Sequence, residues 1–284
     1  MGMTAMSAWR EFPWRTYTIC APHRAIRTAG SAGRAHARAR GWPLVCDAHR
    51  AQKGRAGFIR IDSVHQGDQD GVKGVYHINA VDCVTQWEVV ATCEKISEAY
   101  LLPVLAEMLA AFPFTILGVH ADNGSEYINH RVAAMLDKLN AELTKSRPRR
   151  SNDNALAETK NGAVVRKFLG YSHIPQRFAA QVNDFCRDYL NPYLNLHRPC
   201  LFAQERTDAR GKVTKRYPQH LVQTPLEKLT SLSPEYRNLR PDVALQALQR
   251  QADAMSDNEA ADRLQKARTA LFESINRRLS RSAA

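Results

Sequence analysis

The sequence contains no long apolar run. No window approaches the roughly 18 consecutive apolar residues that a membrane-spanning helix needs. The N-terminus also lacks the basic-then-apolar pattern of a secretory signal peptide. We therefore expect a soluble, cytoplasmic protein with no membrane partner.

Cysteine is scarce, with six residues in 284 and no repeating spacing. A fold held together by disulfides is therefore not expected, and a reduced chain is the simpler interpretation. Two C-x-x-H pairs, Cys20 with His23 and Cys46 with His49, offer a set of zinc ligands as an alternative. We favour this zinc site less, because no apolar frame surrounds the pairs and their spacing is not that of a standard finger.

Acidic residues are outnumbered by basic ones. The chain has 40 Lys and Arg against 28 Asp and Glu, a formal net charge of +12. A basic surface gains affinity for a polyanion by releasing counterions from phosphate, so nucleic acid is the first candidate partner. The charge is uneven, because residues 1–55 hold ten Lys or Arg and two acids, which is 10 − 2 = +8.

The first predicted unit, residues 1–54, is rich in Arg, Ala and Gly and shows no sustained periodicity of 2 or 3.6. Such composition is typical of a poorly ordered basic segment. A truncated gene or a misplaced start would produce the same pattern.

A regular pattern begins at Gly57. Three segments rich in Val, Ile and aromatic residues, 57–65, 74–85 and 87–94, predict an antiparallel meander. A helix over 97–112, with Ser97 at its N-cap, and a buried strand over 114–120 follow. Further segments predict a helix, a strand and two helices, over 129–140, 141–146, 154–170 and 175–195. This order predicts an α/β fold, a five-stranded mixed sheet flanked by helices.

Three acids stand out within this layout. Asp62 lies inside the first strand, where an ionised carboxylate costs several kcal/mol unless it is paired or bound to a metal. Asp122 ends the buried strand, at an Asp-Asn-Gly turn that would also form without any catalytic role. Glu158 falls in the first turns of a helix, and residues 123–157, 35 in number, separate it from Asp122.

These segments resemble the DDE superfamily of transposases and retroviral-type integrases. The matching pieces are "FIRIDSVH", "HADNGSEYIN" and "SRPRRSNDNALAETKNG", and the resemblance covers residues 57–198. It implies a ribonuclease-H-like catalytic core with Asp62, Asp122 and Glu158 as catalytic and metal-binding residues. The segment "RYPQHLVQTPLEKL" resembles the region that follows the core in bacterial insertion-sequence transposases.

The chemistry of that family explains why carboxylates are needed. In-line phosphodiester transfer uses one metal ion to activate the attacking oxygen and a second to stabilise the leaving oxygen. Mg²⁺ prefers oxygen ligands, and Mn²⁺ is able to substitute for it. By resemblance, Asp62 bridges two Mg²⁺ ions, Asp122 binds one and Glu158 the other. No protein nucleophile is required.

Weaker expectations concern DNA contacts. A basic loop precedes Glu158, and two polar side chains follow it on its helix, so the expected DNA-binding residues are Lys145, Arg147, Arg149, Arg150, Asn161 and Arg166. A solvated, flexible loop is the alternative for the four cations. His65 and His120 flank the acids but are more often packing residues than ligands.

The resemblance implies a DNA transposase or integrase of the bacterial cytosol and nucleoid. It would cleave double-stranded DNA at the element's ends, join it to a target, and act as a homo-oligomer. The alternative is an inactive or truncated transposase remnant that binds DNA without catalysis, because no helix-turn-helix pair is recognisable ahead of the core. A plain ribonuclease H fits less well, because of the long segments outside the core and the 35 residues between Asp122 and Glu158. A calcium-binding loop at "QGDQDG" is not favoured either, because the segment lacks the Glu that such a loop needs. The predicted units after residue 54 are the core at 55–200, a small hairpin-containing β module at 201–240 and a helical basic tail at 241–284.

Overall fold

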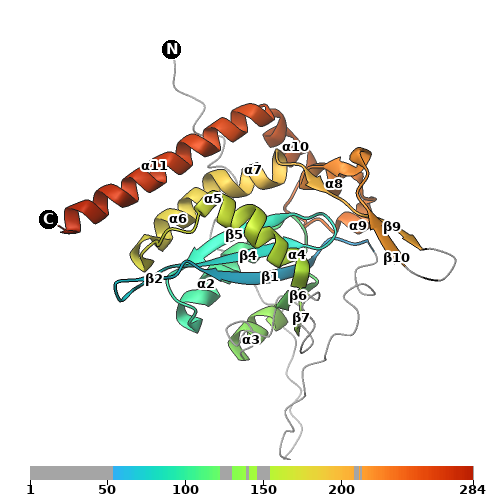
Figure 1. Ribbon diagram of the computed structural model, residues 1–284. Helices are drawn as coiled ribbons and strands as arrows, with labels where there is room; N and C mark the ends of the chain where they lie inside the picture. The colour runs from blue at the N-terminus through green and yellow to red at the C-terminus, as the bar shows by residue number, and fades with distance from the viewer. Residues whose placement is uncertain are drawn as a thin grey trace, which may run out of the picture. The chain divides into compact units, whose positions relative to one another are not determined.

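The computed structural model describes residues 54–121, 130–138, 141–145, 154–207, 211 and 213–283 (Figure 1). Several expectations lie outside these residues. They concern the basic segment before residue 54 with its two C-x-x-H pairs, and the side chains of Asp122, Arg147, Arg149 and Arg150. Within the described part of the chain, no helix is long and apolar enough to cross a membrane.

A five-stranded mixed sheet forms the centre of the molecule, in the order β5-β4-β1-β6-β7. β1 pairs with β4, and β4 with β5, in antiparallel fashion, whereas β6 pairs in parallel with both β1 and β7. The strand bounds are Phe58–His65 for β1, Tyr76–Asp82 for β4, Glu88–Cys93 for β5, Gly118–Ala121 for β6 and Glu142–Lys145 for β7. The predicted meander is confirmed. A two-stranded ribbon, β2 (Asp68–Gln69) with β3 (Val72–Lys73), extends the turn between β1 and β4.

β6 is shorter than the apolar run predicted. The run begins at Phe114, but ladder pairing begins at Gly118, because the preceding backbone is engaged elsewhere. Phe114 forms an isolated bridge with Leu239, and the amide of Thr115 donates to the carbonyl of Asn238 at 2.9 Å. All four residues of β6 are buried, as expected for a strand covered on both faces.

Helices cover both faces of the sheet (Figure 1). α2 (Glu98–Ala110) and α3 (His130–Lys138) lie on one face, and Ser97 occupies the N-cap of α2 as expected, without a capping bond from its side chain. The opposite face carries α4 (Ala155–Lys160), η2 (Asn161–Arg166) and α5 (Lys167–Leu169), then η3 (Gln176–Phe178), α6 (Ala179–Phe185), η4 (Cys186–Leu190) and α7 (Asn191–Leu196). The predicted fold class, a ribonuclease-H-like five-stranded mixed sheet flanked by helices, is confirmed by this strand order and layering.

Each of the two long helical stretches on that second face contains a π-helical segment. The stretch from α4 to α5 is π-helical over η2, and the stretch from α6 to α7 is π-helical over η4. Such segments shift the phase of the side chains that follow them. The first stretch ends at Gly170, whose φ of 75° a residue with a side chain adopts only with strain.

The C-terminal part adds short elements and a long helix. Their bounds are Cys200–Leu201 for β8, Gln204–Thr207 for β9, Val213–Arg216 for β10, Gln219–Leu221 for η5, Val222–Gln223 for β11, Pro225–Ser231 for α8, Pro234–Arg237 for α9, Leu245–Asp253 for α10 and Asp257–Ala283 for α11. Thr224 and Glu227 form a capping box at the start of α8. The predicted unit boundaries at 200 and 240 stay predictions.

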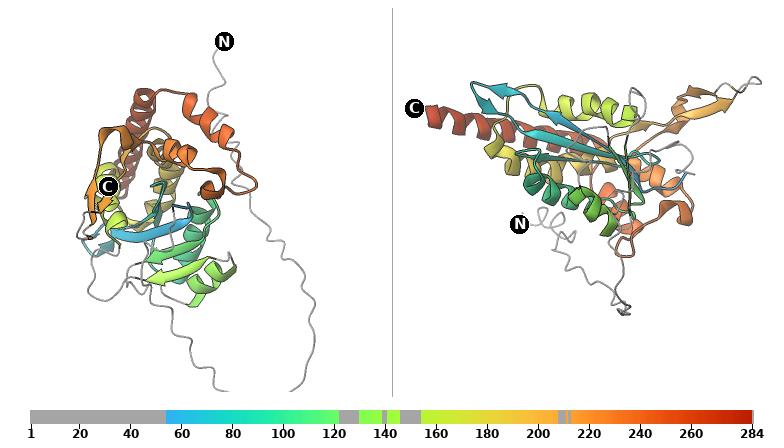
Figure 2. Two further views of the ribbon diagram at one scale, coloured as in Figure 1. Left: turned by 90° about the vertical axis from the view of Figure 1, so that its right-hand side faces the viewer. Right: turned by 90° about the horizontal axis from the view of Figure 1, so that it is seen from below.

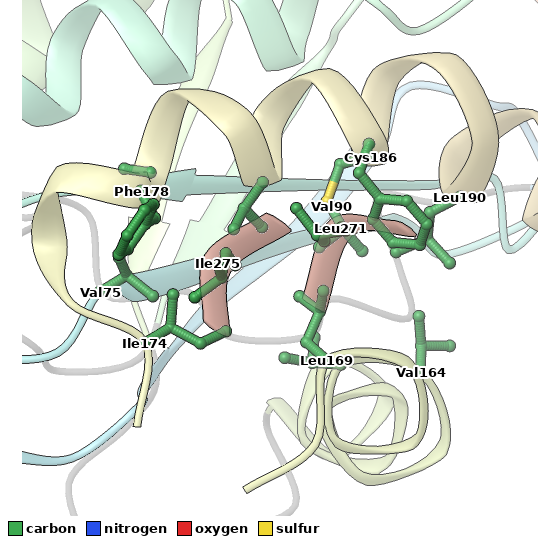
Figure 3. Close-up of a cluster of buried hydrophobic side chains, with 14 of the residues drawn as sticks. Val75, Val90, Val164, Leu169, Ile174, Phe178, Cys186, Leu190, Leu271 and Ile275 are labelled. Carbon is green, nitrogen blue, oxygen red and sulfur yellow. The ribbon is translucent and has the colours of Figure 1, made fainter. Parts of the chain in front are cut away.

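The helix α11 shares its core with the sheet. Figure 3 shows Leu271 and Ile275 of α11 among side chains from the sheet and the other helices, including Val75 and Val90. Leu271 is 5% exposed and Ile275 is 2% exposed. Burying two such side chains stabilises the fold by about 1.5–3 kcal/mol each, so this helix contributes directly to the stability of the core.

Candidate active site

Two asparagines fasten the helix that carries Glu158 to the central strand. Asn154, at the N-cap of α4, donates from Nδ2 to the carbonyl of Ile61 at 3.1 Å. Asn161, directly after α4, donates from Nδ2 to Oδ2 of Asp62 at 2.7 Å. Both contacts end on β1, on consecutive residues. The helix therefore lies against the strand at the position of the first acid.

Glu158 lies between these two anchors on the same side of the helix. It follows Asn154 by four residues and precedes Asn161 by three, and residues three or four apart are neighbours on a helix surface. Since both asparagines contact β1, Glu158 belongs to the side of α4 that faces that strand. Its side chain is exposed. The structure thus places Asp62 and the Glu158 side of α4 next to each other.

Asp62 is half-buried and lies in a network of amides. Its Oδ1 accepts from its neighbour, the amide of Ser63, at 2.8 Å. Its cross-strand partner in the sheet is Asn79 on β4. Asn79 Nδ2 donates to Asn161 Oδ1 at 3.3 Å, and Asn161 donates in turn to Asp62. The carboxylate therefore accepts hydrogen bonds both from the backbone of β1 and from the helix.

The second predicted acid, Asp122, directly follows β6, a strand that pairs in parallel with β1. The last described pair of the two strands joins Ile61 to Ala121. In the sequence, each of these residues is followed by an aspartate, Asp62 and Asp122. Asp122 itself lies outside the described residues, so its role stays a prediction.

The described acids suit a hard divalent cation, because Asp62 and Glu158 both offer carboxylate oxygens. Among the described residues there is no group of three or more His, Cys, Asp or Glu that could hold a metal ion. The predicted set includes Asp122, which is not among them. If divalent ions bind, Asp62 and Glu158 are the described residues that would hold them.

The two predicted DNA-binding residues on the helix make contacts within the protein. Asn161 is half-buried and engaged with Asp62 and Asn79. Arg166 donates to Gln66 Oε1 at 2.8 Å and to the carbonyl of His65 at 3.0 Å. Contact of either residue with DNA stays a prediction.

Arg166 and Gln66 form a group of hydrogen bonds at the C-terminal end of β1. Gln66 is 3% exposed, and its Nε2 donates to the carbonyls of Gly170 at 3.2 Å and Ser172 at 2.7 Å. The guanidinium of Arg166 lies 5.0 Å from the ring centroid of Tyr171, a side chain that is 77% exposed. Arg166 is the last residue of the π-helical segment η2. Its role in the described structure is to tie the helix to the strand.

Of the predicted basic loop, the structure describes only the backbone of Lys145, which ends β7. The two histidines that flank the acids make stacking and polar contacts within the protein. His65 stacks on Tyr76 with ring centroids 4.3 Å apart. His120 Nδ1 lies 2.9 Å from Thr144 Oγ1 on the neighbouring strand.

A buried ion pair beside the site was not anticipated from the sequence. Lys160 Nζ lies 3.3 Å from Glu88 Oε2 on β5, and both side chains are nearly inaccessible to solvent. The same ammonium lies 3.3 Å from Cys200 Sγ. Burial raises the pKa of Glu88, and the nearby charge of Lys160 opposes that effect. Lys160 follows Glu158 by two residues, so it secures α4 on the side turned toward the core.

The outer edge of the sheet is covered by three asparagines that the sequence also did not reveal. Asn183, Asn191 and Asn195 project from the stretch α6-η4-α7 toward β5. Each accepts from a backbone amide and donates to the carbonyl of the same residue, namely Thr92, Val90 and Glu88 in turn, over distances of 2.6–3.1 Å. The three side chains occupy the hydrogen-bonding positions that a sixth strand would take. The edge of the sheet is thereby protected from pairing with another chain.

Comparison with known proteins gives limited matches. No model of a known protein family matches the chain. It is 31% identical over 162 residues to "Uncharacterized protein y4rM" of Sinorhizobium fredii (strain NBRC 101917 / NGR234), which covers 57% of this chain and 46% of that protein. The chain thus spans about half the length of the curated relative that it matches.

Two solved structures are similar to parts of the chain. The crystal structure of the catalytic core domain of BIV integrase matches with a TM-score of 0.36 and 14% identity, over 60% of this chain and 91% of that chain. The cryo-EM structure of the simian T-cell lymphotropic virus intasome in complex with PP2A regulatory subunit B56 gamma matches with a TM-score of 0.36 and 18% identity, over 45% and 46% of the two chains.

Proposed function

We propose that this protein is a metal-dependent DNA transposase or integrase, which cleaves DNA and transfers the strand of an insertion sequence to a target. The observation that carries the proposal is the pair of hydrogen bonds from Asn154 and Asn161 to β1. These bonds hold the Glu158 side of α4 against Asp62. They support the proposal that Asp62 and Glu158, two carboxylates distant in the sequence, belong to one site.

Asp62, Asp122 and Glu158 are the proposed catalytic and metal-binding residues. Mg²⁺ ions bound there would activate the attacking oxygen and stabilise the leaving oxygen, and Mn²⁺ would serve in their place. The protein's own contribution is to fix the carboxylates. Asn161 and the amide of Ser63 orient Asp62, while the anchors of α4 limit where Glu158 can reach.

The proposed partner is double-stranded DNA, both element ends and target, and the proposed active form is a homo-oligomer. The net charge of +12 supports a polyanionic partner. The proposed phosphate contacts near the site come from Lys145, Arg147, Arg149 and Arg150, four cations within six residues of the sequence.

Single substitutions of the acids test the proposal. Asp62→Asn, Asp122→Asn and Glu158→Gln should each abolish Mg²⁺-dependent cleavage and strand transfer on a duplex carrying the element's flanking DNA. DNA affinity and the unfolding transition should remain close to those of the unchanged protein. Asp137→Asn and Glu273→Gln remove exposed acids on α3 and α11 and serve as matched controls with full activity.

The same assay separates an enzyme from a remnant that binds DNA without catalysis. A remnant would bind the duplex and yield no metal-dependent product from any of the proteins, including the unchanged one. Activity that persists in Asp62→Asn or Glu158→Gln would show that the reaction takes place elsewhere and would refute the proposed site.

A further inference from the structure

A two-stranded β-ribbon, β9 with β10, extends away from the body of the protein (Figure 2, right). All four residues of β10 are exposed, and so are Gln204, Arg206 and Thr207 of β9. Even the apolar side chain of Val213 is 52% exposed. Burial in the protein's own core therefore does not explain why this ribbon has a regular structure.

An isolated two-stranded ribbon is marginally stable in water. This ribbon has the hydrogen bonds of its own ladder, but few apolar contacts are available to side chains that are exposed on both faces. A binding partner would supply the missing contacts. The chemistry of the two faces indicates what that partner is.

The register of the ribbon separates its charges onto different faces. Paired residues of antiparallel strands point to the same face, and successive residues alternate between faces. On one face, the register places position 205, an acid in the sequence, opposite Lys215. The other face, which we call the arginine face, consists of the two pairs Arg206 with Thr214 and Gln204 with Arg216.

The arginine face carries two cations and no acid. Its remaining side chains are neutral: Gln204 is able to donate hydrogen bonds, and the hydroxyl of Thr214 donates to the carbonyl of Arg206 at 3.1 Å. Arginine presents a planar fork of donors that suits phosphate oxygens and the edge of guanine. The ribbon thus offers a donor-rich, positively charged surface.

We propose that the arginine face binds duplex DNA, with the ribbon in the major groove and Arg206 and Arg216 contacting phosphates. The major groove is about 12 Å wide and admits a two-stranded β-ribbon. This inference rests on the proposed function, because it names a second DNA-binding surface of the same protein, separate from the catalytic acids and the basic loop.

The test is a salt titration of DNA binding by the full chain, without divalent metal, on a short duplex of fixed length. Arg206→Ala/Arg216→Ala should weaken binding at least about tenfold, because each charged hydrogen bond contributes more than a neutral one. The slope of log K against log salt should flatten by roughly 0.9 for each phosphate that the variant no longer neutralises, about 1.8 in all. Arg206→Lys/Arg216→Lys keeps both charges and should retain the slope.

The matched control is Arg277→Ala/Arg281→Ala, which removes the same charge from exposed positions near the end of α11. This variant should keep nearly the original slope and affinity. An equal loss in both double variants would mean that net charge alone is responsible, and the inference would be wrong. It would also be wrong if the Arg206→Ala/Arg216→Ala protein bound DNA normally and changed only its oligomeric state, because the ribbon would then serve contact between copies.

Binding without metal keeps this inference distinct from the proposed function. One outcome is that the salt slope flattens in Arg206→Ala/Arg216→Ala, while the unchanged protein yields no metal-dependent product. This result would support the DNA-binding surface and refute the proposed enzymatic activity. The opposite outcome is that cleavage depends on Asp62 and Glu158, while Arg206→Ala/Arg216→Ala binds DNA as well as the unchanged protein does. This result would refute the DNA-binding surface and support the proposed enzymatic activity.

Discussion

Asn161 donates a hydrogen bond of 2.7 Å to Asp62, a residue 99 positions earlier in the chain. Through its Oδ1 the same side chain accepts from Asn79 on the neighbouring strand β4. One amide therefore connects the helix that carries Glu158 to two strands of the sheet. A side chain with this set of contacts positions the acid, whether or not it also reaches DNA.

Removing this amide should impair the proposed reaction without unfolding the protein. Partners that orient metal-binding side chains typically contribute about 10–100-fold to metal affinity or activity. For Asn161→Ala we expect a loss of that size in Mg²⁺-dependent cleavage, together with a higher Mg²⁺ concentration for half-maximal activity. Thr159→Ala, two positions earlier on an exposed part of the helix, is the control. An unchanged Mg²⁺ dependence in Asn161→Ala would contradict a positioning role.

His77 should make the stability of the protein fall below neutral pH. The ring is completely buried on β4, with Nδ1 2.9 Å from Thr92 Oγ1. Burial, aided by the charge of Arg166, lowers the pKa of His77 from 6.5 to about 3. A depressed pKa means that the unfolded chain binds the proton first, so the stabilisation is present above pH 6.5 and is lost as pH falls toward 3.

Because of this one proton, the free energy of unfolding should fall by about 1.4 kcal/mol for each pH unit below the pKa of His77 in the unfolded chain. Urea unfolding at pH 7.5, 6 and 5 should show the decline before most carboxylates titrate. His77→Gln keeps a polar group near Thr92 and removes the titration, so its stability should change less over the same interval. Parallel curves for the two proteins would contradict the assignment to His77.

The asparagines on the sheet edge should be essential to stability. Asn195→Ala leaves the amide and carbonyl of buried Glu88 without the partners that now lie at 2.7 Å. An unsatisfied buried polar group costs about 1–3 kcal/mol, so the free energy of unfolding should fall by about 2–4 kcal/mol. Asn258→Ala, at an exposed position near the start of α11, is the control and should change stability little. A loss of less than about 0.5 kcal/mol in Asn195→Ala, the range of an ordinary surface substitution, would mean that water replaces the amide.

The buried ion pair predicts a non-additive double variant. Lys160→Met leaves the carboxylate of Glu88 buried without its ammonium, and breaking a buried pair costs about 3–5 kcal/mol. Adding Glu88→Gln to Lys160→Met removes the unpaired charge and should restore much of the lost stability. Chemical unfolding of the two single variants and the double variant gives the coupling energy. Additive losses would show that the two side chains act independently.

Much of the fold follows from local patterns in the sequence. The runs rich in Val, Ile and aromatic residues at 57–65, 74–85 and 87–94 predicted the three antiparallel strands that the structure contains, because such side chains favour strands. The long apolar run after Phe114 predicted a buried strand but not its start at Gly118. Where that strand begins depends on hydrogen bonds from Thr115 and Phe114 to residues 238 and 239, and no local pattern contains that information.

The sequence by itself determined the strands and the main helices, because residue composition and periodicity are local properties. It singled out Asp62 because an acid within an apolar strand is costly, whereas Glu158 was predicted from a family resemblance and its spacing in the sequence. Only the tertiary structure decided which side chains orient and support them. Asn161 meets Asp62 across 99 positions, and Asn195 meets Glu88 across 107. An asparagine in a helix has the same local pattern whether it faces water, DNA or a strand edge. Its role is therefore decided by the packing of helix against sheet, which brings distant residues together.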